Sequence, residues 1–157
     1  MTVTGVIEAI GPPLRAPLSG QACVGYRAHA RVLDGPHGIS VIGEPTEVRA
    51  IRFRLVTAKG TLVVDTNAAL EVRAQPLVPR QPAREAAFLA DHGFPERSPT
   101  DGAFDEVALV VGGRVTVTGM LVRERLPPEH GGYRDAGDER VLITSTAQPL
   151  TVRDPAW

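Results

Sequence analysis

The sequence predicts a mainly β protein, a small and partly open β-barrel similar to an OB fold, with one short helix between two groups of strands. Short segments rich in β-branched residues alternate between apolar and polar side chains, which is typical of half-buried strands. Glycines and prolines separate these segments, as turns require. One segment has the composition and end signals of a helix. At 157 residues, the chain is expected to form a single domain, residues 1–157.

The first group of strands begins with residues 2–10, which end at a Gly-Pro-Pro sequence. Residues 14–20 are expected to form a corner that leads into a second strand over residues 22–33. The alternation of this second strand places five side chains on an inner face: Val24, Tyr26, Ala28, Ala30 and Val32. Arg27, His29 and Arg31 fall on the opposite face.

A loop rich in glycine and proline is expected over residues 34–45, followed by a strand over residues 46–56. In that strand Ile51, Phe53 and Leu55 are expected to point inward, and Arg52 and Arg54 outward. A turn at residues 58–60 then leads to a short strand at residues 61–65.

The helix is predicted over residues 83–92. Pro82 suits its first turn, and Gly93 lies where a left-handed C-terminal cap would, with Phe94 able to fold back and Pro95 preventing continuation.

The second group of strands follows a loop at residues 95–104 and a short turn that starts at Asp105-Glu106 and ends at Gly112-Gly113. Residues 114–125 form its strongest strand, interrupted at Gly119 by a bulge or tight coil. A polar loop over residues 127–139 and two short strands at 140–146 and 149–153 complete the chain.

Composition excludes several function classes. The net charge is −1 and aromatic residues are 4% of the chain, so neither a strong basic field nor many stacking platforms are available for nucleic acid. Cys23 is the single cysteine, which excludes an internal disulfide and a cysteine-based zinc cluster. No signal peptide and no apolar run of about 20 residues is present. The expected location is cytoplasmic or peripheral to a membrane.

No catalytic, metal or cofactor site is predicted. The histidines His29, His37, His92 and His130 form no paired ligand spacing, the acidic residues form no catalytic pair, and the glycines form no phosphate-binding loop.

Three motifs carry a resemblance to a known family. The first is the corner Pro13-Leu14-Arg15-Ala16-Pro17-Leu18-Ser19-Gly20, followed by Cys23-Val24-Gly25-Tyr26. The second is Gly60-Thr61-Leu62-Val63-Val64-Asp65, and the third runs from Glu106 to Gly119. Together they resemble the GIDE domain, also called the BAM ("beside a membrane") domain. The resemblance implies a bacterial member without a RING or transmembrane helices, acting as an accessory binding or regulatory domain close to a membrane.

Two of the candidate sites lie at the corner and at the cysteine. Arg15 could offer a charge to a ligand, and Ser19 and Gly20 could offer backbone N–H groups; the alternative is a rigid connection fixed by its prolines. Cys23 could be a reactive thiol because the alternation puts it on the face of Arg27 and His29. The alternative for Cys23 is a packing role in the core.

The third candidate site is an arginine-rich face. If the strands at 22–33 and 46–56 pair as a hairpin, Arg27, His29 and Arg31 lie beside Arg52 and Arg54, with Arg49 nearby. Like charges across strands repel, so acidic neighbours or an anionic partner should offset them. Asp34, Glu44 and Glu47 are the acidic candidates. A solvated face with interspersed acids and a docking surface for an acidic or phosphate-bearing partner are both open interpretations.

The function that these features favour is a non-enzymatic interaction module for a protein or peptide partner. The alternative is OB-like binding of nucleic acid or another anionic ligand through the arginines. The net charge and the scarcity of aromatic residues argue against nucleic acid.

Overall fold

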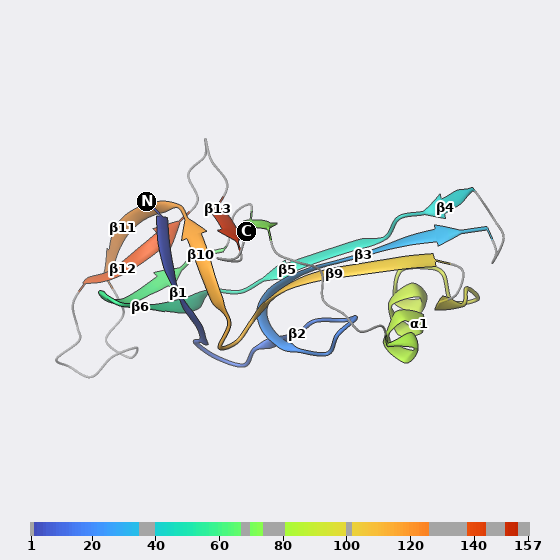
Figure 1. Ribbon diagram of the computed structural model, residues 1–157, viewed down its shortest axis with the longest axis horizontal. Helices are drawn as coiled ribbons and strands as arrows, with labels where there is room; N and C mark the ends of the chain where they lie inside the picture. Colours follow the sequence, from blue (N-terminus) through green and yellow to red (C-terminus); the bar gives the residue numbers. More distant parts are fainter. Residues whose placement is uncertain are drawn as a thin grey trace.

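The computed structural model describes residues 2–34, 40–66, 70–73, 81–99, 102–125, 138–143 and 150–153. It confirms a mainly β chain with one short helix. The strands form two separate sheets, here called sheet A and sheet B. Figure 1 shows sheet A at one end of an elongated molecule, with the long strands of sheet B extending away from it.

Sheet A has eight strands in the order β11-β12-β7-β6-β1-β10-β13-β8. Their bounds are β1 Thr2–Ala9, β6 Phe53–Thr57, β7 Gly60–Val64, β8 Leu70–Arg73, β10 Arg114–Thr118, β11 Met120–Arg125, β12 Asp138–Ile143 and β13 Leu150–Arg153. Neighbours are antiparallel except for the parallel pairs β12–β7 and β13–β8. Within the residues described, sheet A does not close into a barrel.

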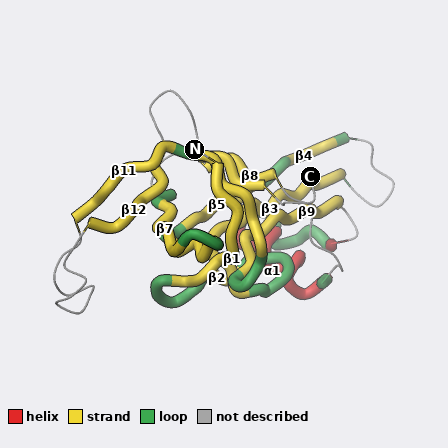
Figure 2. The backbone as a smooth tube through the Cα atoms, turned by 60° about the vertical axis from the view of Figure 1, so that its left-hand side comes forward, coloured by secondary structure: helices red, strands yellow, loops and turns green. Residues whose placement is uncertain are grey.

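Sheet B is organised around its longest strand, β3. Its bounds are β2 Leu14–Arg15, β3 Ala22–Leu33, β4 Val41–Gly43, β5 Thr46–Ala50 and β9 Gly102–Val110. Strand β9 pairs with β3 along one edge, while β2, β5 and β4 pair in turn along the other. From a second side, β3, β4 and β9 run together, away from β11 and β12 (Figure 2).

In the part of the chain that the structure describes, two apolar cores hold the sheets. The sheet A core contains Ile7, Val24, Phe53, Leu55, Leu62, Val64, Leu109, Val115 and Val117. The helix-side core contains Ala16, Leu18, Cys23, Tyr26, Ala28, Ala30, Val32, Phe88 and Leu89. Phe88 and Leu89 come from α1, Pro82–Asp91, so the helix packs on the face of β3 that carries small alanines. Burial of these aliphatic and aromatic side chains is the main stabilising term.

The helix ends as the sequence predicted. Gly93 has φ +91°, and the Phe94 N–H donates to the carbonyl of Leu89 at 2.8 Å, which closes a left-handed C-terminal cap. The Phe94 ring then packs against the helix-side core.

Several predicted elements are confirmed, and others are wrong. The strands at 2–10, 22–33 and 61–65 and the interruption at Gly119 are present. The predicted strand at 46–56 divides instead: β5 pairs with β3 in sheet B, and β6 pairs with β1 and β7 in sheet A. The predicted loop and turn over 95–113 contain the nine-residue strand β9.

The last part of the chain agrees in part with the elements predicted from the sequence. Strands β12 and β13 lie where the last two strands were expected. The residues 126–137, which hold most of the predicted polar loop, lie outside the described residues, as do residues 35–39 and 74–80.

Candidate functional site

The candidate site is the outer face of sheet B, the face opposite α1. Arg27, His29 and Arg31 alternate along β3 with the buried Ala28 and Ala30. Because α1 packs on the alanine side, the three basic side chains point the other way. The predicted placement of these three side chains on one face of the strand is confirmed, and a binding role for them stays a prediction.

The strand register gives each basic side chain its neighbours on this face. Arg27 lies between Val48 of β5 and Val107 of β9. His29 lies between Thr46 and Asp105 in the same two strands.

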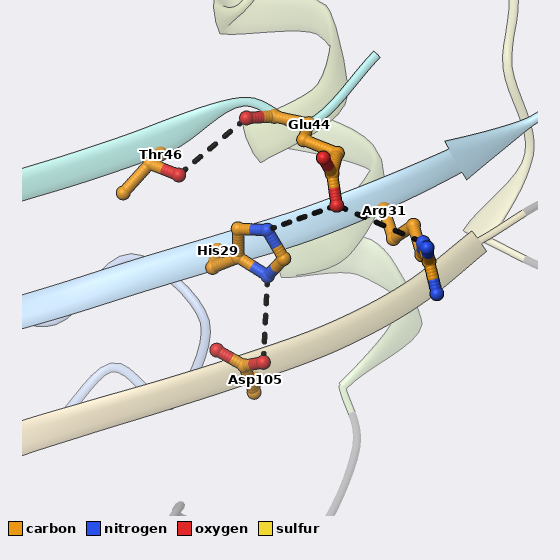
Figure 3. Close-up of polar contacts among 5 residues, drawn as sticks. All are labelled: His29, Arg31, Glu44, Thr46 and Asp105. Atoms are coloured by element: carbon orange, nitrogen blue, oxygen red, sulfur yellow. Dashed lines mark hydrogen bonds and ion pairs between the residues drawn. The ribbon is translucent and has the colours of Figure 1, made fainter. Parts of the chain in front are cut away.

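Acidic side chains lie close to two of the three basic side chains (Figure 3). Glu44 Oε1 lies 3.8 Å from His29 Nε2 and 3.7 Å from Arg31 Nε. Asp105 Oδ2 lies 3.4 Å from His29 Nδ1. The backbone carbonyl of Glu44 accepts a hydrogen bond from Thr46 Oγ1 at 3.4 Å. Of the predicted acidic partners, Glu44 is therefore present on this face.

Arg27 differs from its two neighbours. It is exposed, and within the described part of the chain no carboxylate forms an ion pair with it. Beside it Val48 is 54% exposed, the highest value among the exposed large apolar side chains of the described residues. A free guanidinium next to exposed aliphatic surface is the least satisfied part of this face.

Arg52 and Arg54 do not join the face, so this part of the predicted site is wrong. Arg54 lies on β6, where its Nη1 is 3.8 Å from Glu8 Oε1 of β1. Arg52 lies between β5 and β6, where the chain leaves sheet B for sheet A. The cause is the division of the predicted strand at 46–56 between the two sheets.

Glu47 and Arg49 lie on the helix side of β5. The register places them opposite Ala28 and Tyr26. Glu47 Oε2 accepts a hydrogen bond from the Tyr26 hydroxyl at 2.9 Å. Burial, together with this carboxylate, raises the pKa of Tyr26 to about 12, so the hydroxyl remains a donor at neutral pH.

The corner that contains Arg15 and Ser19 is satisfied internally. Glu106 is buried, and its carboxylate accepts hydrogen bonds from the backbone N–H groups of Leu18 at 2.6 Å and Ser19 at 3.0 Å. The Gly20 N–H donates to the carbonyl of Ala16 at 2.8 Å. The N–H groups that were predicted to meet a ligand therefore already have partners in the fold.

The side chains around this corner reinforce it. Arg15 Nη1 donates to the Gly20 carbonyl at 3.1 Å, and Gln81 Nε2, just before α1, donates to the Ser19 carbonyl at 3.0 Å. The interpretation of the corner as a rigid connection fits these contacts.

Cys23 is not on the basic face. The register of β3 with β9 shifts between Cys23 and Gly25. This irregularity points the Cys23 side chain toward the helix-side core. Burial raises the pKa of its thiol. The predicted proximity to Arg27 and His29 is therefore wrong, and Cys23 packs in the core.

A pocket of about 250 Å³ lies beside the start of β1 and the turn between β6 and β7, and Lys59 is one of the residues that line it.

Across the described ranges, no group of three or more His, Cys, Asp or Glu side chains could hold a metal ion. His37 and His130 lie outside these ranges. Of the helices described, none has the length and apolar character needed to span a membrane.

Asp105 and Glu106 lie in a different kind of element from the one that the sequence predicted. They were expected in a turn, but both lie in β9. Residues 102–110 do alternate, but the buried Glu106 breaks the apolar pattern of the inner face.

No protein-family model, curated protein or solved structure matches the chain.

Proposed function

We propose that this protein is a non-enzymatic interaction module that binds an acidic segment of a protein partner on the outer face of sheet B. The proposal rests on the surroundings of Arg27. This side chain is exposed, no carboxylate of the described residues forms an ion pair with it, and it lies between the exposed Val48 and the partly exposed Val107. Arginine beside apolar surface is enriched where proteins bind one another.

The chemistry favours a carboxylate-bearing partner. A guanidinium forms paired, charge-assisted hydrogen bonds with a carboxylate, and the two valines would cover an apolar side chain next to it. Because the face is a rigid sheet whose other side is covered by α1, little ordering would be needed on binding.

Nucleic acid or another anionic ligand is the second candidate, and the same arginines favour it. Glu44 and Asp105 on this face reduce its positive charge. Tyr26, which could stack on a base, is 4% exposed and faces the helix side. A protein segment therefore fits the face better.

The family and the location belong to the same proposal. We place the chain with the GIDE or BAM domains on the strength of the corner motif, with sheet A as the OB-like part and a position in the cytoplasm or beside a membrane. The contacts of Glu106 with Leu18 and Ser19 support it, because they give the corner motif a structural role.

A peptide-display selection on the full chain tests the proposal. Enriched peptides should combine Asp or Glu with an apolar residue, and Arg27→Glu should lower their affinity by about tenfold or more. Arg54→Glu, on the other sheet, is the matched control and should bind like the wild type. Oligonucleotides and anionic vesicles form two further arms of the experiment.

The proposal is wrong if no acidic peptide is enriched, or if Arg27→Glu binds the selected peptides as tightly as the wild type. Binding of oligonucleotides alone, with a steep loss in salt, would favour the second candidate.

A further inference from the structure

The free edge of β5 carries a pattern that is complementary to itself. The sequence of this strand is Thr46-Glu47-Val48-Arg49-Ala50, so a glutamate and an arginine flank a central valine. Among the strands that the structure describes, β3 is the partner of β5, and none pairs with its other edge. An unpaired edge is a template for another strand.

The backbone of β5 shows which groups face that edge. The Ile51 N–H donates to the carbonyl of Val24 at 2.8 Å, and the Ala30 N–H donates to the carbonyl of Pro45 at 3.0 Å. Hydrogen-bonded and non-hydrogen-bonded pairs alternate along an antiparallel ladder. In the register of β3 with β5, this alternation turns the N–H and C=O groups of Thr46, Val48 and Ala50 away from β3.

We propose that two copies of this chain pair through their β5 edges, antiparallel and centred on Val48. Val48 of each copy then faces Val48 of the other, and Thr46 faces Ala50. These are the residues whose backbone groups point outward, so each pair exchanges two hydrogen bonds. The twofold symmetry is the commonest form of assembly.

The same register determines which charged side chains face one another across the two copies. Glu47 of one copy faces Arg49 of the other, in non-hydrogen-bonded pairs, where facing side chains lie closest. Any other antiparallel strand would need the same Glu-x-Arg order, whereas a second copy supplies it by symmetry. Val48 is 54% exposed, and Thr46 and Arg49 are exposed as well, so the described residues leave these side chains accessible to a partner.

This inference goes beyond the proposed function and does not depend on it. A twofold axis perpendicular to the sheet keeps both outer faces on the same side. The two Arg27 side chains would then lie on one continuous sheet, on either side of the paired β5 strands.

Charge reversal tests the pairing by sedimentation velocity on the full chain. Wild type should sediment as a dimer at high concentration. Glu47→Arg and Arg49→Glu each place like charges opposite one another, and each should weaken the dimer by about tenfold or more. A mixture of the two variants restores every opposite-charge pair, so it should form a heterodimer. Glu8→Arg, an exposed reversal on β1, is the matched control and should remain dimeric.

Because Glu47→Arg also removes the hydrogen bond from the Tyr26 hydroxyl, a further variant tests the pairing without changing Glu47. Val48→Pro removes an N–H that faces away from β3, which an edge strand tolerates. It should be monomeric with an unchanged circular dichroism spectrum. The inference is overturned if wild type is monomeric at its highest soluble concentration, or if its dimer is unaffected by the single reversals and by Val48→Pro. Arg27→Glu should leave the dimer intact, which separates this result from a failure of peptide binding.

Discussion

Glu106 shows at the scale of one residue how a buried charge fixes a loop. The residue is 2% exposed, and its carboxylate accepts two backbone hydrogen bonds from the corner, at Leu18 and Ser19. A buried carboxylate is tolerated when hydrogen bonds satisfy it. This side chain therefore ties the corner to β9.

Glu106→Gln should lower the free energy of unfolding by about 2 kcal/mol, since an amide cannot accept both bonds and leaves a buried N–H unsatisfied. Urea denaturation followed by circular dichroism measures the change. Glu8→Gln alters a side chain that is 56% exposed, and it should change stability by less than about 0.5 kcal/mol. Equal effects of the two substitutions would show that the corner does not depend on Glu106.

At the scale of one element, β1 depends on the absence of a side chain at Gly5. A Cβ built there would lie 2.5 Å from the carbonyl oxygen of Val56 in β6, the strand that pairs with β1 through Val6 and the residues after it. Backbone cannot move aside as a flexible side chain can. Gly11, beyond the end of the same strand, has open space around it.

Gly5→Ala should therefore destabilise the protein by about 2 kcal/mol, because β1 and β6 must separate to admit the methyl group. Gly11→Ala should change stability by no more than about 0.5 kcal/mol. Thermal denaturation of the two variants provides the comparison. A Gly5→Ala variant as stable as Gly11→Ala would mean that the two strands are not so closely packed.

At the scale of the whole molecule, the described residues form two apolar cores that share β3 and β9. Val24 and Leu109 belong to the sheet A core, while Tyr26, Ala28 and the partly buried Ala108 pack in or against the helix-side core. The irregular register between Cys23 and Gly25 marks the transition. Loss of one core should therefore loosen one sheet more than the other.

Phe88→Ala removes a side chain that is 2% exposed from the helix-side core, at a cost of about 3–5 kcal/mol. Hydrogen–deuterium exchange should then rise mainly in β3, β5, β9 and α1, with β1, β6 and β7 still protected. A uniform rise over both sheets would show instead that the molecule opens as a single cooperative unit.

The sequence by itself determined the strands with clear alternation, the helix with its Gly93 cap and the basic face of β3. Local patterns are sufficient for these features, because side-chain periodicity and turn chemistry depend on neighbouring residues. The sequence also indicated Glu44 as a neighbour of these basic side chains, since it lies at the end of the loop between the two predicted strands.

Only the tertiary structure decided which strands share a sheet. It separated Arg52 and Arg54 from Arg27. It directed the Cys23 side chain into the helix-side core. It also brought Asp105 beside His29 of β3, and Glu106 to the corner. These outcomes depend on the point at which a continuous extended segment changes sheets and on a one-residue shift in register. A register shift exchanges the two faces of a strand, and nothing in the local residue pattern fixes where it occurs.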